Sequence, residues 1–229
     1  MKKILLLMSL ILSFPFISCG DDKDEPESPD NHEWVDLGLT SGTLWATCNV
    51  GAHSPEEYGD YFAWGETAPK EVYEWSTYKW ISSDNNDFGF TKYCTNRSDG
   101  FNGFVDNKTE LELEDDAAYV NWGKNCRIPS LEQIKELINS CSWQRTTLNG
   151  VNGQLVTGPN GNTMFLPAAG NRQKQQHHDD GMGCYLSRTL NSDLPRYSCG
   201  LYLGPAGWTW GYGTRYYGQT VRAVHIPKN

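Results

Sequence analysis

The chain opens with two lysines followed by an apolar stretch. Residues 4–17 are almost all apolar, with interruptions at Ser9 and Ser13. The stretch is too short and too close to the start of the chain for a convincing membrane-spanning helix. We therefore predict a signal peptide over residues 1–18.

The residues at the end of this stretch indicate how it is processed. Residues 16–19 read FISC and resemble a lipobox, in which a small residue precedes a cysteine that becomes the acylated N-terminus. We predict cleavage before Cys19 and lipid attachment to its thiol, which would anchor the protein in the outer membrane. The alternative is an ordinary signal peptide that happens to end at a cysteine.

Charged residues and prolines follow Cys19. Residues 19–32 contain almost nothing to bury, which is typical of a solvated tether. An acidic cluster directly after a lipidated cysteine resembles the surface-export signal of some lipoproteins, so we predict display on the cell surface. A plain spacer facing the periplasm is the alternative.

The rest of the chain, residues 33–229, has short apolar pieces separated by turn-forming residues. Such pieces predict short strands, and a glycine- and proline-containing turn at residues 158–161 predicts a hairpin. The predicted strands cover residues 34–37, 43–46, 61–64, 150–156, 163–166, 184–186, 201–203 and 219–225.

One segment has clear helical periodicity. Ser130 is a good N-cap, and Gln133 three residues later completes a capping box. Apolar residues then recur at helical spacing as far as Cys141. We predict a helix at about residues 130–141 and a weaker one at residues 56–58. The predicted fold class is α+β, a single domain with short strands, one clear helix and long loops.

Composition and charge narrow the function classes. The chain has a formal net charge of −9, and removal of Lys2 and Lys3 with the signal peptide would leave the mature chain at −11. Without a basic patch, nucleic acid is not expected as a partner, and neither are anionic lipid head groups. Membrane attachment would depend on the acyl chain of Cys19.

Six cysteines remain beside Cys19. Disulfides are possible in an exported protein, but six cysteines allow fifteen pairings and the sequence does not choose among them. No C-x-x-C pair occurs, so we expect neither a zinc site nor a thioredoxin-like redox pair.

Five blocks of sequence resemble one family. They are VDLGLTSGTLWATCNVGA at 35–52, YGDYFAWGE at 58–66, CRIPS at 126–130, FLPAAG at 165–170 and GQTVRAV at 218–224. Together they resemble the FISUMP-type surface lipoprotein domains, which are similar to C-type lectins and to the formylglycine-generating enzyme. The resemblance implies a C-type-lectin-like domain whose two ends lie close together. Most members have no assigned activity, and one fold hosts many functions.

The resemblance raises two chemical possibilities. Formylglycine-generating relatives bind copper with a cysteine pair, and Cys184 and Cys199 lie in roughly the matching region, but the flanking residues differ from that motif. A structural disulfide or two unrelated thiols is the preferred interpretation. The tripeptides with which C-type lectins bind calcium and sugar are missing from the domain. We expect no catalytic residue, no metal and no cofactor.

The C-terminal segment departs from the family pattern. Some lectin-fold surface proteins are diversified by retroelements that mutate adenines, so an Asn codon can never become Lys, Glu, Gln, Met or Trp. None of these five types occurs in residues 184–207. The segment is therefore either a diversified binding face or a divergent but fixed version of the family sequence.

Under either interpretation the same residues are candidate ligand contacts, because Tyr, Trp and Arg make strong contacts at low entropic cost. They are Arg188, Arg196, Tyr197, Trp208, Trp210, Tyr212, Arg215 and Tyr216. We predict a surface-anchored, non-catalytic module that binds a protein or glycan outside the cell. The alternatives are a cofactor enzyme of the formylglycine-generating type and an adhesin subunit of a surface filament.

Overall fold

A computed structural model describes residues 32–84, 87–123, 125–178 and 181–225. The predicted signal peptide, Cys19 and nearly all of the tether lie outside the described residues. Among the residues that it does describe, no helix combines the length and the apolar character needed to span a membrane. Residues 31–229 form one compact unit.

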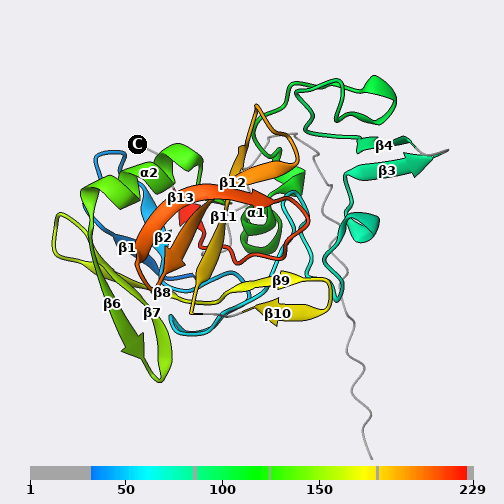
Figure 1. The fold of residues 1–229 in the computed structure, drawn as a ribbon. Coiled ribbons are helices and arrows are strands. Elements are labelled where there is room, and N and C mark those ends of the chain that lie inside the picture. The colour runs from blue at the N-terminus through cyan, green and yellow to red at the C-terminus, as the bar shows by residue number, and fades with distance from the viewer. Residues whose placement is uncertain (1–31, 85–86, 124, 179–180, 226–229) are drawn as a thin grey trace, which may run out of the picture. The chain divides into compact units, whose positions relative to one another are not determined.

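Antiparallel strands make up most of the secondary structure (Figure 1). The described residues contain only two α-helices, α1 (Ala117–Trp122) and α2 (Leu131–Ser140). The fold is therefore β-rich, and the predicted α+β class is wrong. Chain that we expected to be loop instead pairs into small sheets, because tertiary contacts rather than local propensity decide strand pairing.

Within the described residues, the strands form five separate small sheets. The largest is four-stranded, in the order β1-β2-β14-β5, and two are three-stranded, β6-β7-β8 and β11-β12-β13. Strands β3 and β4 form a two-stranded sheet, as do β9 and β10. The bounds are β1 Trp34–Asp36, β2 Leu44–Ala46, β3 Ile81–Asp84, β4 Asp87–Phe90, β5 Cys126–Arg127, β6 Ser142–Leu148, β7 Val151–Thr157, β8 Thr163–Pro167, β9 Asn171–Gln173, β10 Gln176–His178, β11 Gly183–Leu190, β12 Tyr197–Gly204, β13 Gly207–Thr214 and β14 Val224–His225. Three 3₁₀ turns complete the elements, η1 Trp75–Thr77, η2 Phe101–Gly103 and η3 Leu113–Asp115.

The predicted helix at residues 130–141 is confirmed as α2. The Ser130 hydroxyl accepts a hydrogen bond from the Gln133 N–H at 3.2 Å, and the Gln133 side chain accepts one from the Ser130 N–H at 2.9 Å. This reciprocal pair satisfies two donors that a helix start otherwise leaves without partners. The weaker helix predicted at residues 56–58 is wrong, because that segment forms only a turn closed by the Glu57 N–H and the Ser54 carbonyl.

Most predicted strands are present, with changed lengths. Strands β1, β2, β7 and β8 lie where the sequence predicts them, and β11 and β12 are longer than expected. The strand predicted at 61–64 is wrong, because only an isolated bridge joins Phe62 to Gln219. The segment 219–225 contributes only the short strand β14, whereas β6 and β13 were not predicted.

One hydrophobic cluster fixes helix α2 against the β11-β12-β13 sheet. Ile134 and Leu137 of α2 pack against Tyr185, Leu201 and Leu203 from strands β11 and β12. Helix α2 thus covers one face of the β11-β12-β13 sheet (Figure 1). Strand β13 forms an edge of that sheet.

Candidate ligand-binding surface

Four of the eight candidate residues share one face of the β12–β13 hairpin. Trp208, Trp210 and Tyr212 of β13 lie opposite Leu203, Leu201 and Cys199 of β12, and residues directly opposite in an antiparallel pair point to the same side. Tyr197 lies on this side too, at the start of β12. We call Tyr197, Trp208, Trp210 and Tyr212 the aromatic face. Their exposed fractions are 37%, 37%, 38% and 53%, respectively.

Glycines occupy much of the opposite side of β13. Gly211 and Gly213 alternate with the aromatic residues and face Tyr202 of β12. A Cβ atom built on Gly213 would lie 2.3 Å from the Tyr202 hydroxyl oxygen, closer than real Cβ contacts come. The glycines therefore allow Tyr202 to lie flat against β13. Because successive side chains of a strand alternate between its two sides, these glycines lie on one side of β13 and Trp208, Trp210 and Tyr212 lie on the other.

Neighbouring elements hold the rings of the aromatic face. Trp208 stacks on Trp143 of β6, with ring centroids 5.1 Å apart and an interplanar angle of 13°. The Lys135 ammonium of α2 lies 5.1 Å from the centroid of the Trp210 ring, within range of a cation–π contact. Trp210 in turn meets Tyr212 edge to face. The partly exposed rings are thus ordered before any ligand arrives, which lowers the entropic cost of binding.

Two of the remaining candidates have structural partners. Arg215 is completely buried, so the expectation that it is exposed is wrong. Its guanidinium lies against the Phe90 ring and donates to the Tyr93 and Pro195 carbonyls at 3.0 Å each. Tyr216 is half-buried, with its ring centroid 4.8 Å from that of Trp75.

The last two candidates are arginines with carboxylate partners. Arg188 is half-buried, and its Nε lies 3.2 Å from Glu110 Oε2. Its Nη1 also donates to the Ile128 carbonyl, so this side chain links two segments of the chain. Arg196 is exposed, but it forms an ion pair with Asp99 at 2.7 Å. None of these four residues belongs to the aromatic face.

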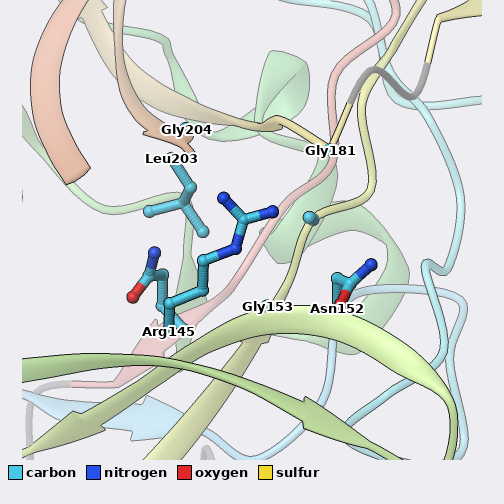
Figure 2. Close-up of a pocket in the computed structure, with 8 residues that line it drawn as sticks. Arg145, Asn152, Gly153, Gly181, Leu203 and Gly204 are labelled. Carbon is cyan, nitrogen blue, oxygen red and sulfur yellow. The ribbon is translucent and has the colours of Figure 1, made fainter. Parts of the chain in front are cut away.

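A small cavity lies where β6 and β7 meet the tip of the β12–β13 hairpin (Figure 2). Its volume is about 10 Å³, and Leu203 and Gly204 form part of its wall. Arg145 of β6 and Gln154 of β7 are directly opposite each other in the sheet, and both line the cavity. Figure 2 shows the Arg145 guanidinium directed between Leu203 and Gly181.

Lys135, Trp143 and Arg145 also lie beside this surface, and they were not predicted from the sequence. Trp143 and Arg145 lie two residues apart on β6, whose sequence SWQRTTL has no regular alternation of apolar and polar residues that would predict a strand. Nor does any local pattern predict that this strand meets the hairpin tip, because that contact depends on tertiary packing.

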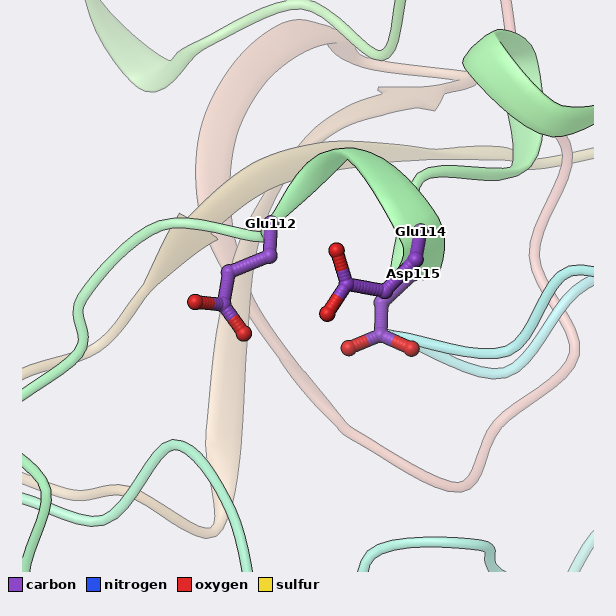
Figure 3. Close-up of side chains that lie close together, drawn as sticks. All are labelled: Glu112, Glu114 and Asp115. Carbon is purple, nitrogen blue, oxygen red and sulfur yellow. The ribbon is translucent and has the colours of Figure 1, made fainter.

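Three carboxylates also gather, away from the aromatic face, on and beside η3 (Figure 3). The Lys92 ammonium lies 2.5 Å from Glu112 Oε2, 2.6 Å from Asp115 Oδ2 and 3.4 Å from Glu114 Oε1. Burial acts to lower the pKa of Lys92, but hydrogen bonds to Asp115 and Glu112 raise it above its ordinary value. A protonated lysine thus already supplies the positive charge at this cluster, which we interpret as an internal ion-pair network.

Cys184 and Cys199 do not form a pair. Cys184 lies opposite Tyr202, three residues along β12 from Cys199, and residues an odd number apart on a strand point to opposite sides. Both are free thiols. Burial raises the pKa of Cys184 above its ordinary value and that of Cys199 to about 11. One ion cannot bridge their sulfur atoms in this arrangement.

Comparisons with protein-family models, with curated proteins and with solved structures found no match. The resemblance to FISUMP-type domains therefore stays a prediction from the sequence.

Proposed function

We propose that this protein is a lipid-anchored binding module, held at the outer membrane through Cys19 and displayed at the cell surface. The domain binds a protein or glycan outside the cell without catalysing a reaction. The resemblance of its sequence to FISUMP-type lipoprotein domains supports this proposal, and so does the lipobox-like end of the predicted signal peptide.

The aromatic face is the observation that carries the proposal. Soluble domains seldom leave several large aromatic side chains exposed in a row, and such surfaces commonly mark interaction sites. Tryptophan and tyrosine contribute large contact areas at low entropic cost, and here neighbouring rings and Lys135 hold them in place. The separation of Cys184 from Cys199 favours this function over a copper-dependent enzyme.

A binding screen with matched variants tests the proposed contact surface. The purified protein is applied to arrays of extracellular glycans and proteins, and the affinity for each retained ligand is then measured. Trp210→Ala and Tyr212→Ala should each weaken binding by about tenfold or more, equivalent to about 1.4 kcal/mol. Phe104→Ala removes a similarly exposed ring elsewhere and should leave affinity unchanged. Ligands that bind the unaltered protein and both β13 variants with equal affinity would contradict the proposal.

The anchor is tested separately. Cells labelled with a fatty-acid analogue should incorporate label into the protein and lose that label when Cys19 is replaced by Ala. Protease added to intact cells should remove the domain if it is displayed outside. Label that persists in the Cys19→Ala variant would contradict lipidation at this residue.

A further inference from the structure

We propose that Arg145, which is exposed at the edge of the small cavity, binds the carboxylate of an acidic saccharide, a sugar carrying a carboxylate such as a uronic or sialic acid. This inference rests on the proposed binding function and names the class of its ligand. Arg145 would bind the carboxylate, and the sugar ring would lie in the adjoining groove at the tip of the β12–β13 hairpin.

Arg145 has an available guanidinium. In the part of the chain that the structure describes, it forms no ion pair and no hydrogen bond, whereas Arg127, Arg188 and Arg196 each hold a carboxylate. Gly181 lies beside this guanidinium, since a Cβ atom built on it would be in ordinary contact with Arg145 Nη2 at 3.5 Å. An arginine donates two parallel hydrogen bonds to a carboxylate, which gives both affinity and orientation.

Two buried polar atoms near Arg145 lack partners. Gln154 is only 3% exposed, and its Oε1 accepts no hydrogen bond from any described residue. The same holds for the indole Nε1 of Trp143, which lies two residues from Arg145 on the same side of β6. Leaving a buried polar atom without a hydrogen bond costs about 1–3 kcal/mol, so such atoms call for an explanation. A hydroxyl can both donate and accept, and it therefore suits an orphaned acceptor and an orphaned donor on one surface.

The site has two parts of very different size: a small cavity that fits a single polar group and an open groove that fits a sugar ring. The cavity of about 10 Å³ has room for little more than one oxygen atom. The open groove next to it, of about 610 Å³, shares Leu203 and Gly204 with the cavity wall. Its other lining residues are Met182, Tyr202, Pro205, Ala206, Trp208 and Thr209.

A saccharide matches this combination of surfaces. A pyranose ring has an apolar C–H face that packs against side chains such as Met182, Pro205 and Trp208, and hydroxyls around its rim. A carboxylate on the same ring can reach toward Arg145 while a neighbouring hydroxyl meets Gln154. Because the chain carries a formal net charge of −9, it repels polyanions in general, and binding an acidic saccharide requires a local cation such as Arg145.

Pairs of probes that differ only in the carboxylate test the inference. Calorimetry compares oligogalacturonate with its methyl ester, and sialyllactose with its methyl ester, against the purified protein. At least one acidic member should bind ten times more tightly than its neutral counterpart. Arg145→Ala should remove this difference, and Arg145→Lys should restore only part of it, because lysine lacks the planar fork. Arg97→Ala removes an exposed arginine elsewhere and serves as the matched control.

The outcomes distinguish this inference from the proposed function. If acidic and neutral members bind equally, and Trp210→Ala weakens both while Arg145→Ala does not, the carboxylate site is refuted and the binding module stands. Failure of every acidic saccharide to bind also refutes the inference. Arg145-dependent binding of a peptide with a free C-terminal carboxylate, but of no saccharide, would refute the ligand class.

Discussion

Arg215 illustrates how a buried arginine can be fully accommodated inside a protein. Its Nε donates to the Tyr78 hydroxyl at 2.8 Å, and its Nη1 donates to the Tyr93 and Pro195 carbonyls. The guanidinium also lies 4.3 Å from the centroid of the Phe90 ring. A single side chain thus links four segments of the chain, which is a structural role that sequence alone did not distinguish from a contact residue.

Replacing Arg215 by alanine should destabilise the protein strongly. The substitution leaves a cavity, and it removes the donors of three carbonyls and one hydroxyl. We expect the free energy of unfolding to fall by about 3 kcal/mol or more, measured by urea denaturation. Arg196→Ala, at an exposed ion pair, should change it by less than about 1 kcal/mol. An unchanged unfolding midpoint for Arg215→Ala would show that the buried contacts contribute little.

The cysteines should be protonated and slow to react at neutral pH. Burial raises the pKa of Cys199 to about 11, with a smaller opposing effect from Lys135, and burial raises the pKa of Cys141 to about 11. Because only the thiolate is nucleophilic, alkylation of the folded protein at pH 8 should be roughly 100-fold slower than for ordinary thiols. The rate should increase as the pH rises toward 11.

Mass spectrometry after iodoacetamide treatment measures this reactivity at each cysteine. Unfolding in guanidinium without reductant should expose at least Cys48, Cys94, Cys141, Cys184 and Cys199 as reactive thiols. Rapid labelling of Cys199 at pH 8 in the folded state would contradict the expectation, and so would its recovery in a disulfide.

Among the helices and strands, the sequence predicted those that have a local signal of their own. Helix α2 has both a capping box and an apolar stripe, and the β7–β8 hairpin has a clear turn. Strand β13 was missed because glycine alternates with aromatic residues along it, and glycine usually indicates a turn. The pairing of β13 with β12 compensates for that low propensity, but the pairing becomes visible only in the structure.

The candidate surface was also predicted only in part. Tyr197, Trp208, Trp210 and Tyr212 came from residue type alone and lie on one face. The sequence could not separate them from the buried Arg215, because residue type does not reveal burial. Nor could it place Arg145 beside the hairpin tip, since the two are joined only by packing between sheets.

The glycines on one side of β13 lead to a prediction about stability. Gly213→Ala would place a Cβ atom 2.3 Å from the Tyr202 hydroxyl oxygen and 2.4 Å from Gln219 Nε2. Relieving these contacts should cost about 1–3 kcal/mol of stability, measured by chemical denaturation. Gly204→Ala is the matched control, because its nearest contact would be an ordinary 3.8 Å. Equal stability of the two variants would indicate that Tyr202 moves aside freely.

For the whole molecule, the Lys92 network predicts how stability depends on pH. Hydrogen bonds from Lys108 and then Lys92 lower the pKa of Glu112 to about 2. Since the folded pKa lies below the ordinary value of 4.5, the unfolded chain takes up the proton first. The contribution of Glu112 is therefore fully present above pH 4.5 and is lost as the pH falls toward 2.

Urea midpoints measured at pH 7 and pH 3 test this dependence. Glu112→Gln should reduce the loss of stability between the two pH values relative to the unaltered protein. Glu71→Gln, at an exposed glutamate, should leave that loss unchanged. A Glu112→Gln variant that retains the whole acid-dependent loss would assign the effect to other carboxylates.

The position of β14 has a consequence for the order of events during synthesis. Val224 pairs with Trp45 of β2 on one side and with Arg127 of β5 on the other. Trp45 must therefore wait for a partner made nearly a whole domain later, on the order of 10 to 40 seconds at ordinary translation rates. Until then β2 and β5 lack the strand that joins them in the four-stranded sheet. We therefore expect this sheet to be completed only after almost the whole domain has been synthesised.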